Sequence, residues 1–489
     1  MDLRPTGLPL SVKSHDSQEA GFCPYCSCGC SFIAYIKNGA LKDVYGHPGC
    51  VVGMGSLCTK GITYLQDIVN SPFRLKGFYM EKEAVSRERV LKALRENIKG
   101  KRVAFILTKQ ASLEDFAVAK KAGEVFVDAP LIDFESCTLE LREWAKAKLI
   151  ISIDAEPTLS DVMAMRFVVD AIEAGARVIC ISARYETLCA KAHDRVLLNL
   201  GEMVKFLDRE LEENGEIAKL LKAFRGALVL IGAHLFLTPA RAWFMYFLKK
   251  IREMGANYAI VGDMVRYKAR HIGELFERLD DFDTIVSIGN GLRYFSDQEI
   301  EKSRGKFLFT FSAMPDFSVN VSNACVGISL VPERDFSVFR GGLRTGVFSK
   351  ALISPQSGCE EPWRLIAEAI DLDTKLEDRE VAFGDIKAQR PEGFLEARRW
   401  LYSIGGLCEE LGHWSYWTHG LEPVQTALVS KDIKEEIPRL GGIRKVYSAN
   451  IAKGVVFLSP EFDEYQPFFE GVRPGAFQGR PFYLVEALD

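Results

Sequence analysis

The feature that most constrains the fold is a strand–helix–strand pattern in residues 147–184, AKLIISIDAEPTLSDVMAMRFVVDAIEAGARVICISAR. The apolar runs at 148–153 and 177–181 predict two buried strands, and the residues between them have helical spacing that ends at Gly175. Two strands joined by a helix form a βαβ unit, in which the strands lie parallel in one sheet. We therefore expect an α/β fold with a doubly wound parallel sheet.

The same pattern continues along the chain. A predicted helix lies near residues 239–254, and further apolar runs read GALVLIGAHLF, ANYAIVGDM, FDTIVSIGNG and KFLFTFSA. At 489 residues the chain is also too long for a single ordinary core. We expect a small amino-terminal domain followed by doubly wound, Rossmann-like domains.

The composition is that of a globular protein, with 48% hydrophobic and 26% charged residues and a formal net charge of -4. That charge argues against a nucleic-acid partner. The sequence has no apolar run of the roughly 20 residues that a membrane helix needs, and residues 1–20 lack the apolar stretch of a secretory signal. A cytoplasmic protein with no direct membrane span is expected.

The cysteines are concentrated near the amino terminus. Of twelve in the chain, six lie in the first 58 residues: Cys23, Cys26, Cys28, Cys30, Cys50 and Cys58. Such clustering favours metal binding over disulfides. The spacing Cys23-x2-Cys26-x3-Cys30-x27-Cys58 suits a 4Fe-4S cluster, whose four irons each take one thiolate. Structural zinc is the alternative, and Cys28 could replace Cys26 or Cys30.

Three segments in this region resemble the molybdopterin oxidoreductases, most closely the formate dehydrogenase large subunits. The segments are CPYCSCGC, NGALKDVYGHPGCVVGMGSLCTKG and SPFRLK. The resemblance implies that Cys23, Cys26, Cys30 and Cys58 bind a 4Fe-4S cluster and that Lys60 lies on the electron path. It also implies a pterin cofactor, molybdopterin guanine dinucleotide with molybdenum or tungsten.

The strand–helix–strand segment resembles the dinucleotide-binding module of that family, with Arg184 and Thr187 retained. Residues 154–157 read Asp-Ala-Glu-Pro where the family has a Gly-x-Asn-Pro turn, and Ser182 replaces the acidic ribose-binding residue. Added carboxylates oppose a pyrophosphate, so binding of the pterin there is in doubt.

Two other loops are candidates for contacts with the pterin cofactor. One follows a predicted strand and contains Gly289, Asn290 and Gly291, and the other contains Gly342 and Arg344. A short glycine motif is as often an ordinary turn.

Two further departures concern catalysis. The candidate molybdenum or tungsten ligand is Cys137, followed by Thr138 where the family has His; a lone cysteine is more often a core residue. The carboxy-terminal β-barrel of the family is not recognisable after residue 372. Formylmethanofuran dehydrogenase carries that barrel on a separate subunit, and its B subunit is similar in length.

The family resemblance does not explain two further polar clusters. His413 and His419, with Trp414 and Trp417, are interpreted as packing at a subunit interface rather than as a metal site. The loop that contains Arg334, Arg340 and Arg344 could bind an oxyanion or be a solvated loop.

The expected domains follow from these assignments. They are a polar arm (1–20), an iron–sulfur domain (21–75), an α/β domain (76–136 with 226–371), an inserted Rossmann-like domain (137–225) and a segment of unknown fold (372–489).

Three functional hypotheses stay open. The chain is an oxidoreductase subunit with a metal–pterin site and a small-molecule substrate, a pterin-free electron relay and scaffold, or a zinc-stapled binding module. The first two imply other redox subunits as partners, such as an iron–sulfur or barrel-domain subunit.

Overall fold

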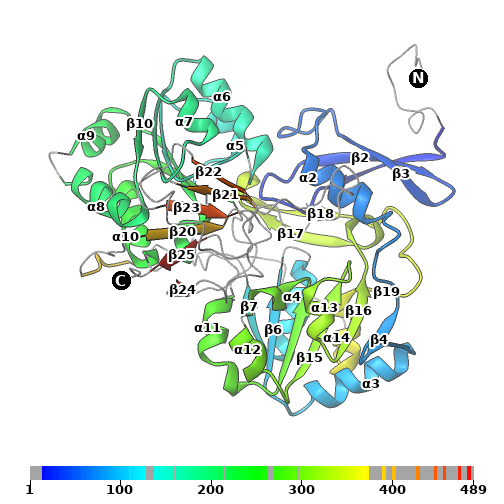
Figure 1. The fold of residues 1–489 in the computed structure, drawn as a ribbon. Helices are drawn as coiled ribbons and strands as arrows, with labels where there is room; N and C mark the ends of the chain where they lie inside the picture. The colour runs from blue at the N-terminus through cyan, green and yellow to red at the C-terminus, as the bar shows by residue number, and fades with distance from the viewer. Residues whose placement is uncertain are drawn as a thin grey trace.

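The computed structural model has two α/β sheets with surrounding helices, a small amino-terminal domain with its own sheet beside them, and two further sheets, a two-stranded and a six-stranded one (Figure 1). It describes residues 14–108, 111–127, 137–158, 160–212, 215–238, 240–262, 269–295, 297–373 and 388–392. Beyond these it describes six short strands within residues 399–485.

The amino-terminal domain is built on a three-stranded antiparallel sheet. Its strands are β1 (Ser17–Phe22), β2 (Ser31–Lys37) and β3 (Ala40–Gly46). Asn38 and Gly39 form the turn between β2 and β3, and both residues have positive φ, 54° and 70°, as a two-residue Asn-Gly hairpin turn requires. Residues 17–20 pair with β2, so the expected polar arm is wrong from Ser17 onward.

The larger α/β sheet has the order β13-β7-β6-β14-β15-β16-β4-β5, with β19 also paired to β16. The strands are β4 (Phe78–Met80), β5 (Glu83–Val85), β6 (Val103–Leu107), β7 (Glu124–Val127), β13 (Arg270–His271), β14 (Thr284–Ile288), β15 (Phe307–Ser312), β16 (Ala324–Ile328) and β19 (Cys359–Glu360). The pairs among β13, β7, β6, β14, β15 and β16 are parallel, as predicted. The strand order reverses between β6 and β14.

The smaller sheet is entirely parallel, with the order β10-β9-β8-β11-β12. Its strands are β8 (Leu149–Ile153), β9 (Arg177–Ser182), β10 (Asp194–Leu197), β11 (Leu228–Gly232) and β12 (Asn257–Val261). The expected boundary at residue 225 is therefore wrong: β11 pairs with β8, and β12 pairs with β11, so both belong to this sheet and the inserted domain continues through Val261. Here the strand order reverses between β8 and β11.

Helices cover both sheets (Figure 1). They are α2 (Thr59–Ile62), α3 (Arg87–Ile98), α4 (Leu113–Ala122), α5 (Leu141–Trp144), α6 (Met165–Glu173), α7 (Thr187–Lys191), α8 (Leu200–Glu210), α9 (Glu216–Ala223), α10 (Arg241–Glu253), α11 (Ile272–Glu277), α12 (Asp297–Lys302), α13 (Phe317–Val321) and α14 (Pro362–Ala369). Helix α3 illustrates why these residues form a helix. Ser86 caps its first turn, and Val90, Leu94 and Ile98 recur at helical spacing and are buried.

One hydrophobic core joins the amino-terminal domain to both sheets, because residues such as Leu65, Phe105 and Ile150 belong to the same buried cluster. A buried ion pair reinforces this contact: Arg74 Nη2 lies 2.5 Å from Glu333 Oε2, and both side chains are fully buried. Arg74 is the arginine of SPFRLK, so this motif residue has a structural role. A hairpin of β17 (Phe336–Arg340) and β18 (Thr345–Ser349) adjoins β1.

The segment expected to have an unknown fold contributes a mixed sheet with the order β22-β21-β23-β20-β25-β24. Its strands are β20 (Arg399–Ser403), β21 (Thr426–Val429), β22 (Lys445–Ser448), β23 (Val455–Leu458), β24 (Val472–Pro474) and β25 (Phe482–Val485). Residues 388–390 approach the smaller α/β domain, where Arg390 pairs with Asp208 of α8 at 2.5 Å. The cluster of His413, Trp414, Trp417 and His419 lies outside the described residues.

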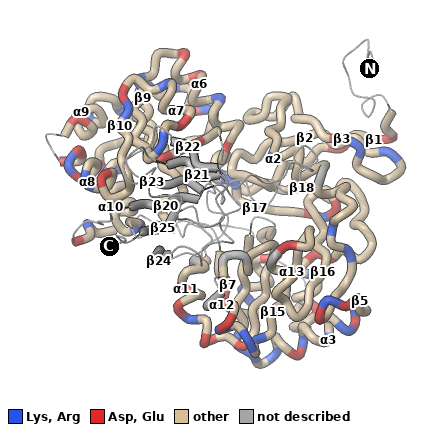
Figure 2. Tube along the Cα trace, viewed as in Figure 1, with Lys and Arg blue, Asp and Glu red and all other residues tan. Residues whose placement is uncertain are grey.

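Charged residues of both signs are interspersed along the outer helices and loops (Figure 2). Among the described residues, no helix has the length and apolar character needed to cross a membrane.

Candidate metal centre

The cysteine loop of the amino-terminal domain connects β1 to β2. Its two ends are held together by the backbone, because Cys23 N donates a hydrogen bond of 2.8 Å to Cys30 O. Gly29 has a φ of +63° and faces Leu343, and a Cβ at Gly29 would lie 2.7 Å from that side chain. The loop is thus tightly folded against a neighbouring segment, with Cys23 and Cys30 almost completely buried.

The fourth predicted ligand reaches this loop from the start of α2. Cys58 is the residue before that helix, and Gly61 lies in its first turn. A Cβ added at Gly61 would lie 3.2 Å from Cys23 Sγ and 4.0 Å from Cys58 Sγ. The absence of a side chain at Gly61 therefore leaves space directly beside two of the predicted ligand atoms.

The four predicted ligands are close enough to influence one another electrostatically. Burial raises the pKa of the Cys23 thiol, and Cys26 and Cys58 raise it further. Burial likewise raises the pKa of Cys30, with additional contributions from Cys26, Cys23 and Cys58, and the pKa of Cys58 is raised by burial and by Cys26. Together these electrostatic interactions include each of the six pairs that the four cysteines can form. Four thiolates gathered in this way need a bound cation to stay ionised, so the donor set fits a metal centre.

Cys28 is also close to the group. A hydrogen bond from Cys28 is the main cause that lowers the pKa of Cys26, while that contact and burial raise the pKa of Cys28 well above its ordinary value. The Sγ atoms of Cys26 and Cys28 and a carboxylate oxygen of Asp161 all lie within 4.8 Å of one another. The choice of Cys26 over Cys28 as a ligand stays a prediction.

Cys50 has a different environment from the other cysteines of this domain. Its Sγ accepts backbone hydrogen bonds from Ser31 at 3.2 Å and from Gly53 at 3.3 Å. These contacts connect the segment after β3 to the start of β2, so Cys50 has a structural role here.

Lys60 lies between the cysteine loop and the smaller α/β domain. Its Nζ donates to Ser160 O at 3.4 Å and lies 5.7 Å from the centre of the Tyr25 ring. Its positive charge helps to lower the pKa of Cys26 and partly offsets the rise in the pKa of Cys58. Lys60 therefore lies beside the candidate metal centre, and its place on an electron path stays a prediction.

Asp161 connects the cysteine loop to the smaller α/β domain, a role that the sequence did not suggest. Its Oδ1 accepts a hydrogen bond of 2.5 Å from Ser27 Oγ, and its Oδ2 accepts one of 2.6 Å from Gly262 N. Asp161 lies in the connection after β8, where the side chains of a parallel sheet often form a polar site. The sequence gives no sign that this residue contacts the cysteine loop, which is far away along the chain.

The segment after β17 supports the other side of the cysteine loop. Arg340 Nη2 donates to Cys23 O at 3.2 Å, and Gly342 N donates to Ser27 O at 3.2 Å. Arg344 is exposed and donates to Thr138 O at 3.0 Å. Arg340 and Gly342 thus contact the backbone of the cysteine loop, whereas Gly342 was expected to contact a pterin cofactor.

Comparison with known proteins agrees with this geometry. Residues 19–70 match the family model described as "Molybdopterin oxidoreductase Fe4S4 domain". This chain carries a molybdopterin oxidoreductase Fe4S4 domain. Formate dehydrogenase 2 subunit alpha (cytochrome c-553) of Nitratidesulfovibrio vulgaris (strain Hildenborough) is 39% identical over 67 residues. That match covers 14% of this chain and 6% of the relative.

Outside the Fe4S4 domain, Cys137 lies in a packed environment. It is fully buried and forms an isolated antiparallel bridge with Ala259 of β12. Its Sγ donates a hydrogen bond of 2.7 Å to Leu139 O. These contacts match the core-cysteine alternative, while its role as a metal ligand stays an untested prediction.

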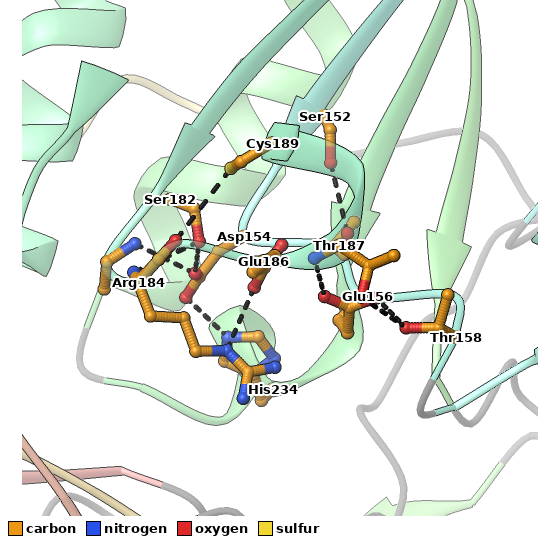
Figure 3. A network of polar contacts seen from close by, with 12 residues as sticks. Ser152, Asp154, Glu156, Thr158, Ser182, Arg184, Glu186, Thr187, Cys189 and His234 are labelled. Carbon is orange, nitrogen blue, oxygen red and sulfur yellow. Dashed lines mark hydrogen bonds and ion pairs between the residues drawn. The ribbon is translucent and has the colours of Figure 1, made fainter. Parts of the chain in front are cut away.

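The carboxyl ends of the smaller sheet hold a polar network at the reversal of the strand order (Figure 3). Asp154 follows β8, and its carboxylate lies 2.8 Å from His234 Nε2 and accepts hydrogen bonds from Ser182 Oγ at 2.7 Å and Ala183 N at 3.1 Å. Burial raises the pKa of Asp154, but His234 and the hydrogen bonds lower it more, to about 2.

Two further carboxylates occupy the start of α7 in the same network (Figure 3). Glu156 Oε2 accepts a hydrogen bond of 2.9 Å from Thr187 N, and Arg184 Nε lies 3.3 Å from Glu186 Oε1. Burial, followed by the charge of Asp154, raises the pKa of Glu186 to about 8. Arg184 and Thr187 thus contact the protein's own carboxylates, and this arrangement does not fit a pyrophosphate at the end of this sheet.

The Gly289-Asn290-Gly291 loop lies at the corresponding point of the larger sheet, between β6 and β14. Gly289 has a φ of +89°, and a Cβ there would lie 1.9 Å from Thr108 Oγ1. Asn290 Oδ1 accepts hydrogen bonds from Ser318 N at 3.2 Å and from Ser318 Oγ at 2.8 Å. The loop occupies the usual ligand position of a doubly wound sheet, and its binding role stays a prediction.

Proposed function

We propose that this chain is the electron-relay and scaffold subunit of a larger oxidoreductase complex, with a 4Fe-4S cluster held by Cys23, Cys26, Cys30 and Cys58. The observation that carries the proposal is the clustering of these four cysteines, which influence one another electrostatically, with Cys23 and Cys58 beside the space that Gly61 leaves. When bound, such a cluster supplies one-electron redox chemistry. The membership of residues 19–70 in the Fe4S4 domain family supports the same assignment.

The protein's own residues support electron transfer in defined ways. Lys60 places a positive charge near Cys26 and Cys58, which stabilises the ionised thiolates. Its hydrogen bond to Ser160 O joins the Fe4S4 domain to the smaller α/β domain. The hydrogen bonds of Asp161 and Arg340 hold the cysteine loop in place between its neighbours. We propose that electrons pass by way of this side of the domain.

A role without pterin is favoured by two features of the α/β domains. The thiol of Cys137 is buried and bonded to the carbonyl of Leu139. The end of the smaller sheet holds the carboxylates of Asp154 and Glu156, which oppose an anionic cofactor. Both features argue against a pterin cofactor as a second redox centre in these domains.

The second candidate is a pterin-bearing oxidoreductase similar to formate or formylmethanofuran dehydrogenases, with molybdenum or tungsten and a small-molecule substrate. The specific observation in its favour is the position of Gly289, Asn290 and Gly291 at the strand-order reversal of the larger sheet. In that case Cys137 would be the metal ligand, and Arg344 would lie near the cofactor.

Elemental analysis and pterin fluorescence of the anaerobically purified chain, co-expressed with subunits encoded beside it, distinguish these candidates. About four irons per chain without pterin, molybdenum or tungsten is the expected result. Pterin together with one of those metals would support the second candidate. Zinc in place of iron would contradict both and leave a zinc-stapled module.

A Lys60→Met variant tests the proposed electron path, with Lys60→Arg as the charge-conserving control. We expect both variants to keep the cluster signal in electron paramagnetic resonance. Reoxidation of the reduced cluster by a soluble acceptor should slow at least several-fold in Lys60→Met and much less in Lys60→Arg. Equal rates in all three proteins would remove Lys60 from the path.

A further inference from the structure

A second group of sulfur and carboxylate atoms lies in the smaller α/β domain. Cys180 lies on β9 and Cys189 on α7, and their Sγ atoms form a disulfide. A carboxylate oxygen of Glu186, the residue before α7, lies within 4.8 Å of both sulfurs. All three residues are buried.

Only one of the two carboxylate oxygens of Glu186 has a polar partner within the described part of the chain. Its Oε1 lies 3.3 Å from Arg184 Nε, but Oε2 is buried and accepts no hydrogen bond from any described residue. The side chain is 1% exposed. A buried carboxylate oxygen without a donor is costly, so the Glu186 carboxylate is suited to receive a cation.

We propose that, when the Cys180–Cys189 disulfide is reduced, Cys180, Cys189 and Glu186 bind one thiophilic divalent cation, with Zn²⁺ as the best chemical match. A small dithiol reductant supplies two electrons and two protons, which break the S–S bond and produce two thiols. Binding of Zn²⁺ then forms two Zn–S bonds and one Zn–O bond to Glu186, and it releases the two thiol protons together with the carboxyl proton of Glu186 where that group is protonated.

The donor set decides the class of cation. Two thiolates and one carboxylate select zinc over calcium or magnesium, which prefer oxygen ligands. Three protein ligands leave the fourth position of a zinc tetrahedron for a water molecule or another small ligand. The three negative charges exceed the charge of the cation by one, and Arg184 beside Glu186 offsets that excess.

The redox state of the two cysteines controls access to this site. In the disulfide the sulfurs are joined to each other and cannot act as thiolate ligands. In the dithiol state the same short connection between β9 and α7 holds both sulfurs near Glu186. Zinc binding is therefore linked to reduction and is independent of the iron–sulfur cluster, because it uses different residues on a different domain.

The test uses the full chain with its iron–sulfur cluster assembled. One sample is reduced with dithiothreitol and one is left oxidised, both are incubated anaerobically with Zn²⁺, and free metal is removed by gel filtration. We expect one zinc per chain in the reduced sample and none in the oxidised sample. Zinc should also slow alkylation of Cys180 and Cys189 by iodoacetamide, measured by peptide mass spectrometry, at least tenfold.

Three variants complete the test. Cys180→Ser should abolish the zinc gained on reduction, and Glu186→Gln should weaken zinc affinity about tenfold. Cys359→Ser, which changes a half-buried cysteine on the larger sheet, should leave both unchanged. Circular dichroism checks that each variant is folded. Absence of zinc from the reduced protein, or equal zinc in Cys180→Ser and the unmodified chain, would overturn the proposal.

Discussion

Asp154 Oδ2 lies 2.8 Å from His234 Nε2, at the point where the strand order of the smaller sheet reverses. In doubly wound sheets this point usually receives a ligand. Here Asp154 has a φ of +46°, a conformation that Asp tolerates better than most residues. Gly232 leaves room for it, because a Cβ there would lie 2.2 Å from Asp154 O. The chain thus fills this position with its own side chains.

Because of the Asp154 carboxylate, the free energy of unfolding should change with pH in the acidic range. Its pKa is lowered from 3.8 to about 2 in the folded chain, so its contribution is present above pH 3.8 and is lost as pH falls through 2. We expect Asp154→Asn to reduce the free energy of unfolding by about 2 kcal/mol at pH 5. The difference from the unmodified chain should shrink towards pH 2, as measured by urea unfolding at several pH values. A difference that stays constant over this range would contradict the assignment.

The ligand assignment can be tested with single cysteine variants. Cys58→Ser should abolish the visible absorption and paramagnetic signal of the cluster, because it removes one of four iron ligands. Cys28→Ser should leave about four irons per chain, because this cysteine is the spare one in the predicted spacing. If Cys28→Ser destroys the cluster while Cys26→Ser preserves it, the ligand is Cys28 instead.

The buried pair of Arg74 and Glu333 should be sensitive to removal of one partner. Arg74→Met leaves the fully buried Glu333 carboxylate without its cation, which is expected to cost about 3–5 kcal/mol of unfolding free energy. The double variant Arg74→Met/Glu333→Leu should recover much of that loss, since it buries no charge.

Urea unfolding measures these changes, and the exposed pair of Lys92 and Glu96 provides a control. Their charged atoms lie 3.9 Å apart, with side chains 77% and 62% exposed. Lys92→Met should change stability by less than about 0.5 kcal/mol. A comparable loss in Lys92→Met and Arg74→Met would show that burial of the pair is not the cause.

Gly289 provides a matched test of close packing. Gly289→Ala meets both an unfavourable φ of +89° and the side chain of Thr108, only 1.9 Å from the new Cβ. Gly305→Ala has a similar φ of +88° but no atom within 4 Å, so it isolates the backbone cost of about 1–2 kcal/mol. We expect Gly289→Ala to destabilise the chain by a further 1–3 kcal/mol or so, measured by urea unfolding. Equal effects would show that Thr108 moves away without cost.

Local sequence patterns predicted most of the individual elements. The apolar runs around Ile150 and Ile179 became β8 and β9, and the helix predicted near residues 239–254 became α10 (Arg241–Glu253). These predictions succeeded because strand and helix periodicities are local properties. The assignment of β11 and β12 to a sheet failed for the opposite reason. Any parallel strand has the same apolar character, and only tertiary packing selects its neighbours.

The sequence by itself determined that four cysteines at metal-ligand spacing lie in the amino-terminal region, because the spacing of thiolate ligands is visible in one dimension. Only the tertiary structure decided what surrounds them. It brought Asp161 to Ser27, Glu186 to Cys180 and Cys189, and His234 to Asp154. The physical reason is that sequence spacing specifies local geometry, whereas contacts between distant segments depend on how β-strands are ordered and on which polar groups must be satisfied when they are buried.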